Sequence, residues 1–264
     1  SRDINRARKV LGTKVEIIKG DIRNKITIKK CLDNVKGIII CISAFSPKLI
    51  RKIESIEKDS ILFVLEEAEK RNISKIVYIS VYDLNNKLIK KYNLKNAVIK
   101  SEVEERLKES GLNWTVLGVP PSMEIFYSMI KGDLMVVPGG GPPLLPVISP
   151  LDVAELASIA LSREDLDKKR IKINGPEAIS FQEAADRISK LYKRQIKLIK
   201  IPLFFTILVS NLLKLFAAIS DNAYFAVEMI GYIKLLNDFP QDLAEKAAEL
   251  CSELVTNCDY QQTT

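Results

Sequence analysis

The sequence contains no histidine among its 264 residues, and this absence limits the chemistry that the chain can perform. A Ser-His-Asp or Cys-His triad, a zinc site with imidazole ligands and a histidine proton relay are all excluded. The four cysteines, Cys31, Cys41, Cys251 and Cys258, lack the spacing of metal ligands. No metal is therefore expected, and catalysis would depend on Lys, Tyr, Ser or carboxylate side chains or on a bound cofactor.

The charge distribution narrows the class of partner. The chain carries 40 Lys and Arg against 33 Asp and Glu, a net charge of +7, and the first 35 residues hold ten of the cations and four of the anions. A basic segment of this kind suits nucleic acid, an anionic membrane or a phosphate-bearing cofactor. Because residues 1–35 contain no aromatic side chain to stack on bases, no nucleic-acid partner is expected.

One apolar segment, 201–219, approaches the length of a membrane-spanning helix. It contains Asn211 and Lys214 and follows the basic stretch YKRQIKLIK, so we expect a buried or surface-lying helix that could contact a membrane peripherally. The charged start at Ser1 does not predict a signal peptide. The wide separation of the four cysteines suits free thiols in a reducing compartment. Together, the two observations favour a cytoplasmic protein.

Short runs rich in Ile and Val alternate with helical patterns and indicate the fold class. We expect strands at 15–18, 37–43, 75–80, 113–117 and 170–174, helices at 26–35, 48–71, 97–110 and 151–163, a helix opened by Ser180, and a wholly helical remainder from 202. Alternating strands and helices predict an α/β fold, a parallel sheet with helices on both faces. Ligands would bind at the carboxyl ends of the strands, in the loops after residues 18, 42, 79 and 117.

Five segments follow one another in an order and spacing that resembles a known family. They are RDINRARKVLGTKVEIIKGDI, KIVYIS, KSEVEERLKESGLNWTVL, PVISPLDVAELA and IKINGPEAISFQEAADRIS, and together they cover about residues 1–200. The set resembles the NmrA-like, atypical short-chain dehydrogenases/reductases. The resemblance implies a Rossmann-like NAD(P)-binding domain at 1–165, and a mainly helical substrate or partner region at 166–264 packed on it.

The glycine-rich loop of that family is missing from the sequence. Members begin with a strand, a Gly-x-Gly-x-x-Gly loop and a helix whose N-terminus binds pyrophosphate. The one glycine cluster, 139–141, lies between prolines and predicts a loop beside the substrate cleft. We therefore expect an N-terminally incomplete or degenerate member with weakened NAD(P) binding. Without strands one and two, segment 15–18 would pair beside 37–43, be held by other contacts or remain detached.

The resemblance also implies a set of cofactor-binding residues. Arg2 would contact the adenosine 2′-phosphate and so favour NADP over NAD, although NAD is not excluded. Asp21 and Ile22 would lie at the edge of the adenine. Ser43 and Ala44 would pass beneath the cofactor ribose, where a small side chain lets the backbone approach closely.

Two catalytic residues are implied by the same resemblance, Ser80 and Lys100. Ser80 would hydrogen-bond a substrate carbonyl, and Lys100 would bind the nicotinamide ribose and also count among the cofactor ligands. The family's Tyr-x-x-x-Lys motif is absent, because Asn96 stands four residues before Lys100. Gly118 occupies the position where many members have Arg.

Three functions remain open from the sequence. The first is a reductase that passes hydride from NADPH to a small carbonyl or quinone substrate. The second is a non-catalytic NAD(P)-binding redox sensor or assembly factor with a protein partner. This function is implied by a weak likeness of the C-terminal tail to plastid and cyanobacterial members. It would place the chain in the plastid stroma or at a membrane. The third is a remnant that binds no dinucleotide. The oligomeric state is not indicated.

Overall fold

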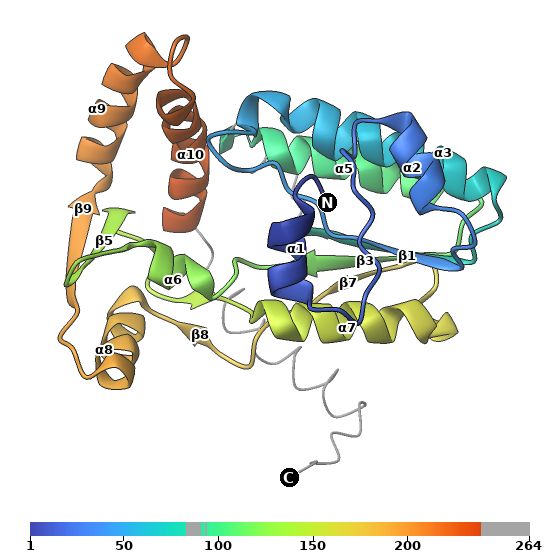
Figure 1. The fold of residues 1–264 in the computed structure, drawn as a ribbon. Coiled ribbons are helices and arrows are strands. Elements are labelled where there is room, and N and C mark those ends of the chain that lie inside the picture. Colours follow the sequence, from blue (N-terminus) through green and yellow to red (C-terminus); the bar gives the residue numbers. More distant parts are fainter. Residues whose placement is uncertain (83–90, 93, 239–264) are drawn as a thin grey trace.

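The computed structural model describes residues 1–82, 91–92 and 94–238, and its core is a four-stranded parallel sheet (Figure 1). The strands stand in the order β1 (Gly37–Ile40), β2 (Lys75–Val81), β3 (Trp114–Val119) and β7 (Lys169–Lys172). Side chains alternate along β2: Ile76 and Tyr78 join one apolar cluster, and Val77 and Ile79 join another on the opposite face. Burial of both faces confirms the predicted Rossmann-like α/β fold.

Helices cover both faces of this sheet, as predicted (Figure 1). The first face packs against α2 (Lys25–Cys31), α3 (Ser60–Lys70) and α5 (Lys95–Glu109), and the second against α7 (Pro150–Ser162). Ser149 caps α7, because its Oγ accepts a hydrogen bond from the backbone N of Leu151. A short helix, α1 (Ile4–Leu11), contributes no buried residue to either face.

The predicted helix at 48–71 is continuous in outline but not uniform. It begins as a 3-10 turn, η1 (Ile50–Lys52), passes through the π-helical segment η2 (Glu54–Asp59) and ends as α3. The apolar side chains of Ile53, Ile61 and Leu65, on its inward side, are all fully buried. The π-helical segment widens the helix by one residue per turn, and it carries Glu57 into the protein interior.

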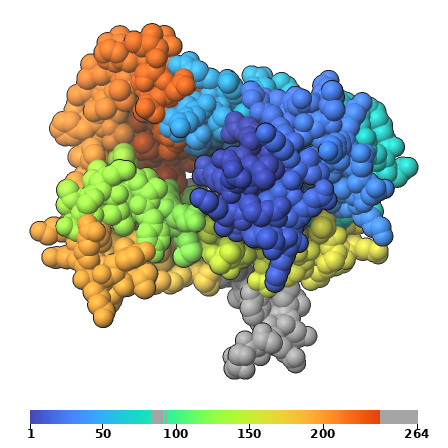
Figure 2. All heavy atoms as spheres, viewed as in Figure 1, coloured from blue at the N-terminus to red at the C-terminus, as the bar shows by residue number. Residues whose placement is uncertain are grey.

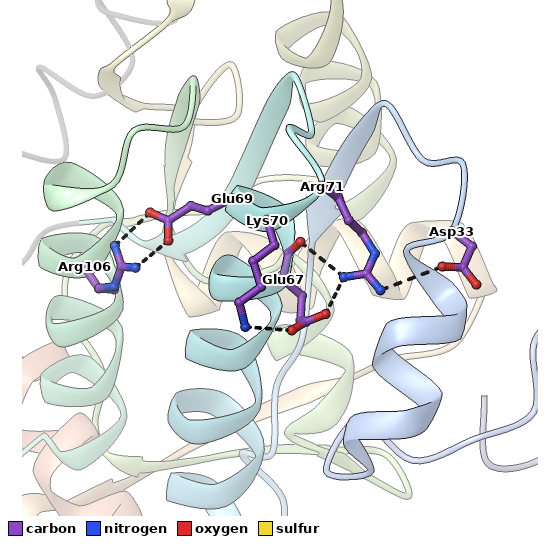
Figure 3. Close-up of polar contacts among 6 residues, drawn as sticks. All are labelled: Asp33, Glu67, Glu69, Lys70, Arg71 and Arg106. Atoms are coloured by element: carbon purple, nitrogen blue, oxygen red, sulfur yellow. Dashed lines mark hydrogen bonds and ion pairs between the residues drawn. The ribbon is translucent and has the colours of Figure 1, made fainter.

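Charged side chains join the ends of α2, α3 and α5 at one end of the sheet (Figure 3). Glu67, only 3% exposed, accepts a hydrogen bond from Arg71, whose guanidinium lies 3.8 Å from the Asp33 carboxylate. On the neighbouring side, Arg106 of α5 contacts Glu69 of α3 at 2.8 Å. These contacts link the end of α3 to the segment after α2 and to α5.

The rest of the chain forms a second body beside the sheet (Figure 1). A small sheet combines β4 (Ile130–Lys131), β5 (Leu134–Gly139) and β9 (Lys197–Pro202), and β6 (Leu145–Pro146) pairs with β8 (Ala178–Ile179). Around them lie α6 (Glu124–Ser128), α8 (Phe181–Tyr192), α9 (Leu203–Leu213), η4 (Lys214–Phe216), α10 (Asp221–Asn237) and, near the main sheet, η3 (Glu164–Leu166). The predicted division at residue 165 stays a prediction, and the pairings of β3 with β7 and of β5 with β9 both cross it.

Segment 15–18 is not a strand, so that prediction was wrong. Of the three expected outcomes for this segment, it is held by other contacts: the Ser1 amino group donates to Ile18 O at 2.7 Å, and Gly20 N donates to Ser1 O at 2.9 Å. Val15 itself is exposed. A run of four residues forms a strand only where a neighbour satisfies its backbone groups, and none of the described strands lies beside it.

The glycine cluster differs from its prediction as well. Gly139 ends strand β5, and the loop begins only at Gly140. All three glycines have positive φ, and a Cβ atom at Gly141 would lie 2.6 Å from the Phe181 ring. Gly139 N donates to Thr206 Oγ1 at 3.0 Å, which ties β5 to α9. The cluster therefore makes a close-packed turn.

Candidate functional site

A buried carboxylate organises the carboxyl ends of β1 and β2. Glu57 is fully buried and accepts hydrogen bonds from the backbone N of Ala44 and from Asn96 Nδ2, the latter at 2.8 Å. Lys100 Nζ lies 3.6 Å from the same carboxylate. Asn96 and Lys100 face Glu57 together because they are four residues apart on α5. The sequence analysis did not identify Glu57, and an acidic residue inside a run of apolar helix positions was its only signal.

Lys100 lies with its Nζ near the carboxyl end of strand β2. It is 8% exposed, its Nζ donates to Ile79 O at 3.3 Å, and it stands 5.3 Å from the centre of the Tyr78 ring. Burial lowers the pKa of the Lys100 ammonium, and the negative charge of Glu57 opposes that lowering. Lys100 is thus a positioned cation that contacts the carbonyl of the residue before the predicted Ser80, and its catalytic role stays a prediction.

Two hydroxyl groups on β2 are buried without a hydrogen-bond partner among the described residues. One is Ser80 Oγ, at 3% exposure, and the other is the Tyr78 hydroxyl. Burial raises the pKa of Tyr78 far above its usual value, so this phenol keeps its proton at neutral pH. A buried hydroxyl without a partner is uncommon in folded proteins, and Ser80 has a donor available for a ligand oxygen.

An arginine from a neighbouring strand occupies the space beside Gly118. Arg170 of β7 contacts Glu104 Oε2 of α5 through Nε at 2.8 Å and donates from Nη2 to Val81 O at 2.7 Å. A Cβ atom at Gly118 would lie 2.8 Å from Arg170 Nη1, so only glycine leaves room for the guanidinium. Sequence reasoning missed Arg170, because the pairing of β3 with β7 brings it there and no local motif announces it.

The predicted adenosine-binding residues lie around a cavity of about 560 Å³. The cavity follows the outer edge of β1, which pairs with no strand among the described residues on that side. Arg2, Asp21, Ile22 and Ser43 all line it. Ala44 is completely buried and does not; its backbone N is instead held by Glu57. The structure thus brings four of the predicted cofactor residues to one cavity and places Ala44 and Lys100 in the adjacent buried network.

The two charged residues of this cavity differ in how they are held. Asp21 accepts from Arg23 Nε at 2.9 Å and Nη2 at 2.6 Å, and these hydrogen bonds hold the pKa of the Asp21 carboxyl well below its usual range. Arg2 is exposed and forms no ion pair with the described residues. A free guanidinium at the mouth of an apolar cavity fits the phosphate of an adenosine moiety. The residues present therefore fit the adenosine half of a dinucleotide.

The family model described as NAD(P)H-binding matches residues 1–164 of this chain. Among curated proteins, prestalk A differentiation protein A of Dictyostelium discoideum is 30% identical over 141 residues, which is 50% of this chain and 42% of the relative. The matched part thus spans less than half of that relative.

Solved structures share the fold. A nucleoside-diphosphate-sugar epimerase from Staphylococcus aureus has a TM-score of 0.65 at 15% identity, with 96% of this chain and 88% of that one covered. An Escherichia coli NADPH-dependent quinone oxidoreductase complexed with NADPH has a TM-score of 0.63 at 15% identity, with 97% and 88% covered. Triphenylmethane reductase of Citrobacter sp., complexed with NADP(H), has a TM-score of 0.64 at 13% identity, with 96% and 88% covered. The family match covers more than half of the sequence and agrees with the predicted NmrA-like resemblance, so the chain belongs to the NAD(P)H-binding family.

Proposed function

We propose that this protein is an NADPH-dependent reductase whose hydride acceptor is a quinone or a similar small conjugated carbonyl compound. The observation that carries the proposal is Ser80 Oγ. It is a buried hydroxyl with no partner among the described residues, and it lies next in sequence to Ile79, whose carbonyl oxygen binds Lys100 Nζ. A hydrogen-bond donor kept free beside a positioned cation suits an acceptor oxygen that gains negative charge during reduction.

The acceptor class follows from the absence of a tyrosine acid at the motif position. NADPH supplies a hydride, and a quinone that gains it becomes a hydroquinone anion, which takes its proton from water. This reaction needs no protonated side chain at the acceptor. Reduction of a simple ketone does need one at the developing alkoxide. Asn96 replaces the motif tyrosine, and the raised pKa of Tyr78 makes this phenol a poor proton donor.

Each residue then has a defined task in the proposal. Ser80 donates a hydrogen bond to the acceptor oxygen. Lys100, held by Glu57, adds positive charge beside it. Arg2 binds the 2′-phosphate that distinguishes NADPH from NADH, while Ser43 and Ile22 contact the adenosine through the cavity at β1. The proposal is compatible with two of the structural neighbours, which are described as an NADPH-dependent quinone oxidoreductase and a triphenylmethane reductase.

Cofactor binding is expected to be weak. Pyrophosphate is normally gripped by a glycine-rich turn at a helix N-terminus, and no such turn occurs in these 264 residues. We expect NADPH to bind more tightly than NADH in a calorimetric titration carried to millimolar cofactor. The absence of binding at that concentration would contradict the proposal.

Replacing Ser80 with alanine tests the carrying observation. We expect Ser80→Ala to lower kcat/KM for a soluble quinone by roughly tenfold to a hundredfold, because one donor to the developing anion is lost. NADPH affinity should stay unchanged, because Ser80 is assigned to the acceptor. The measurement is NADPH oxidation with a quinone and with an aliphatic ketone as acceptors. Ser162→Ala, which removes an exposed hydroxyl on α7, is the matched control. Equal rates in both variants would contradict the role of Ser80.

A second candidate is an NADPH-binding redox sensor that acts on a protein partner without turnover. The buried ion pair of Lys100 with Glu57 favours it, since a lysine already held by a carboxylate can serve as structure alone. The same experiments separate the two functions. NADPH binding without oxidation of the cofactor by any quinone or carbonyl compound would support the sensor.

A further inference from the structure

Helix α9 and the turn η4 present an unusually apolar surface on the outside of the protein. Large apolar side chains form one stripe at helical spacing, which we call the apolar face. Its members are Phe204, Phe205, Leu208, Leu212, Leu215 and Phe216. Their exposed fractions range from 48% for Leu208 to 75% for Leu215. In Figures 1 and 2 this segment lies along an outer corner of the molecule, beyond α10. Contiguous apolar surface of this kind marks a contact site.

Two of the three polar side chains of α9, Thr206 and Ser210, point the other way, and the third, Asn211, is exposed beside Lys214. Thr206 Oγ1 accepts a hydrogen bond from Gly139 N at 3.0 Å, and Ser210 is only 5% exposed. A helix on a water-facing surface normally shows the opposite pattern, with its hydroxyl groups outside and its large apolar side chains inside. The side of α9 with Thr206 and Ser210 therefore packs against the protein, and its outer side, which carries large apolar side chains, suits contact with an apolar medium.

The stretch of chain that contains the apolar face carries only positive charge. Residues 188–220 contain six cations, Lys190, Lys193, Arg194, Lys197, Lys200 and Lys214, and no Asp or Glu. Lys200 lies near the end of β9, the strand that leads directly into α9, and Lys197 begins that strand. Both are exposed, and neither forms an ion pair with the described residues. Such a run attracts an anionic surface, at about 1 kcal/mol per cation close to lipid headgroups.

The same charges argue against a second copy of the chain as the occupant. A twofold dimer would place one apolar face on another, and residues 188–220 of the second copy would supply no Asp or Glu to pair with these cations. None of the described helices is long and apolar enough to cross a membrane. A helix with an apolar outer stripe and flanking cations lies instead in the plane of the bilayer interface, with its aromatic and aliphatic side chains among the acyl chains.

We propose that the apolar face of α9 and η4, with the lysines of β9, binds the surface of an anionic lipid bilayer. The contact holds the protein at the membrane without spanning it. It is independent of the proposed reductase activity, because none of its residues belongs to the cofactor cavity or the Ser80 site.

Vesicle flotation of the whole chain tests the proposal directly. We expect the protein to float with vesicles of phosphatidylcholine containing phosphatidylglycerol, and much less with phosphatidylcholine alone. Leu208→Gln and Leu212→Gln should each lower the partition coefficient about tenfold, since each removes one large apolar side chain that would enter the bilayer. Lys197→Gln with Lys200→Gln should weaken it by roughly tenfold or more at low salt, and by less at high salt.

Matched controls separate this contact from general stickiness. Leu151→Gln and Ile26→Gln remove apolar side chains that are each 80% exposed on other helices, α7 and α2, and they should float like the unchanged protein. A Phe205→Trp probe should shift its fluorescence to shorter wavelength on anionic vesicles, against the buried Trp114 as a constant background.

Three results would overturn the proposal. The first is no flotation with either vesicle. The second is equal flotation with both vesicles and with the lysine variants. The third is a concentration-dependent dimer in solution that Leu208→Gln abolishes, which would assign the apolar face to a second copy. The Tm of each variant should equal that of the unchanged protein, which would show that weaker flotation does not come from loss of folding.

Discussion

A buried carboxylate determines the chemistry of this site at the scale of single residues. Glu57 has no access to water, and an isolated ionised carboxylate there would be very costly. Its charge is met by the Ala44 backbone N, by Asn96 Nδ2 and by the Lys100 ammonium. These contacts hold Lys100 near the carboxyl end of β2.

Replacing this carboxylate with an amide is expected to destabilise the protein strongly. In Glu57→Gln the Lys100 charge loses its partner in a buried site, and the amide NH₂ competes with the donors that it faces. Breaking a buried ion pair on one side typically costs about 3–5 kcal/mol of unfolding free energy, to be measured by chemical denaturation. Glu105→Gln, in an exposed pair with Lys108, should change it by about 0.5 kcal/mol or less. A similar small change for Glu57→Gln would contradict the network.

Pairing of β3 with β7 builds the other side of the site at the scale of elements. The two strands are parallel, and their register brings the Arg170 guanidinium to the backbone of Gly118. Arg170 then binds both the carbonyl end of β2 at Val81 and the buried Glu104 of α5. One side chain therefore locks three strands and a helix at the carboxyl edge of the sheet.

Adding a single methyl group at Gly118 should disturb this joint. Gly118→Ala would place a Cβ atom 2.8 Å from Arg170 Nη1 and 2.9 Å from Tyr82 O, and the second contact is with backbone, which cannot turn aside. We expect a loss of about 1–3 kcal/mol in unfolding free energy, measured by denaturant titration. Gly111→Ala, where no atom lies within 4 Å of the added Cβ, should be neutral or slightly stabilising. Equal stability of the two variants would refute the steric role of Gly118.

The parallel sheet and the C-terminal helices are joined by polar contacts at the scale of the whole molecule. Arg51, at the start of the long helix that leads into α3, contacts Asp221 Oδ1 at 2.5 Å and donates to Ala217 O. Its guanidinium also lies 4.5 Å from the centre of the Tyr224 ring. The contacts tie α10 and the turn before it to the edge of the sheet body.

Removing this link should weaken the attachment of the C-terminal helices. Arg51→Ala loses an ion pair and a cation–π contact that are partly exposed, and we expect a decrease of about 1 kcal/mol in unfolding free energy. Calorimetry should show a lower Tm, with a smaller effect at high salt. Lys108→Ala removes an exposed pair within α5 alone and is the matched control. If both variants unfold alike, Arg51 contributes no more than a surface charge.

Much of the sheet could be predicted from the sequence because its signals are local. The apolar runs that became β1, β2 and β3, the inward stripe from Ile53 to Leu65, and the serine caps of α7 and α8 depend on neighbours along the chain. The predictions that proved wrong depended on distant partners. Segment 15–18 found no strand beside it, and residues 137–139 became part of β5 because β9, far along the sequence, pairs with them.

The sequence by itself determined the fold class, the family and the exclusion of histidine chemistry, since all three follow from residue types and their spacing. Only the tertiary structure decided which side chains meet. Glu57 reaches Ala44 and Lys100 because a π-helical segment packs against α5, and Arg170 reaches Gly118 because two strands pair in one register. Packing also decided that the apolar side of α9 faces outward. An apolar helix can turn either side inward, and here the side with Thr206 and Ser210 packs against the neighbouring elements β5 and α10.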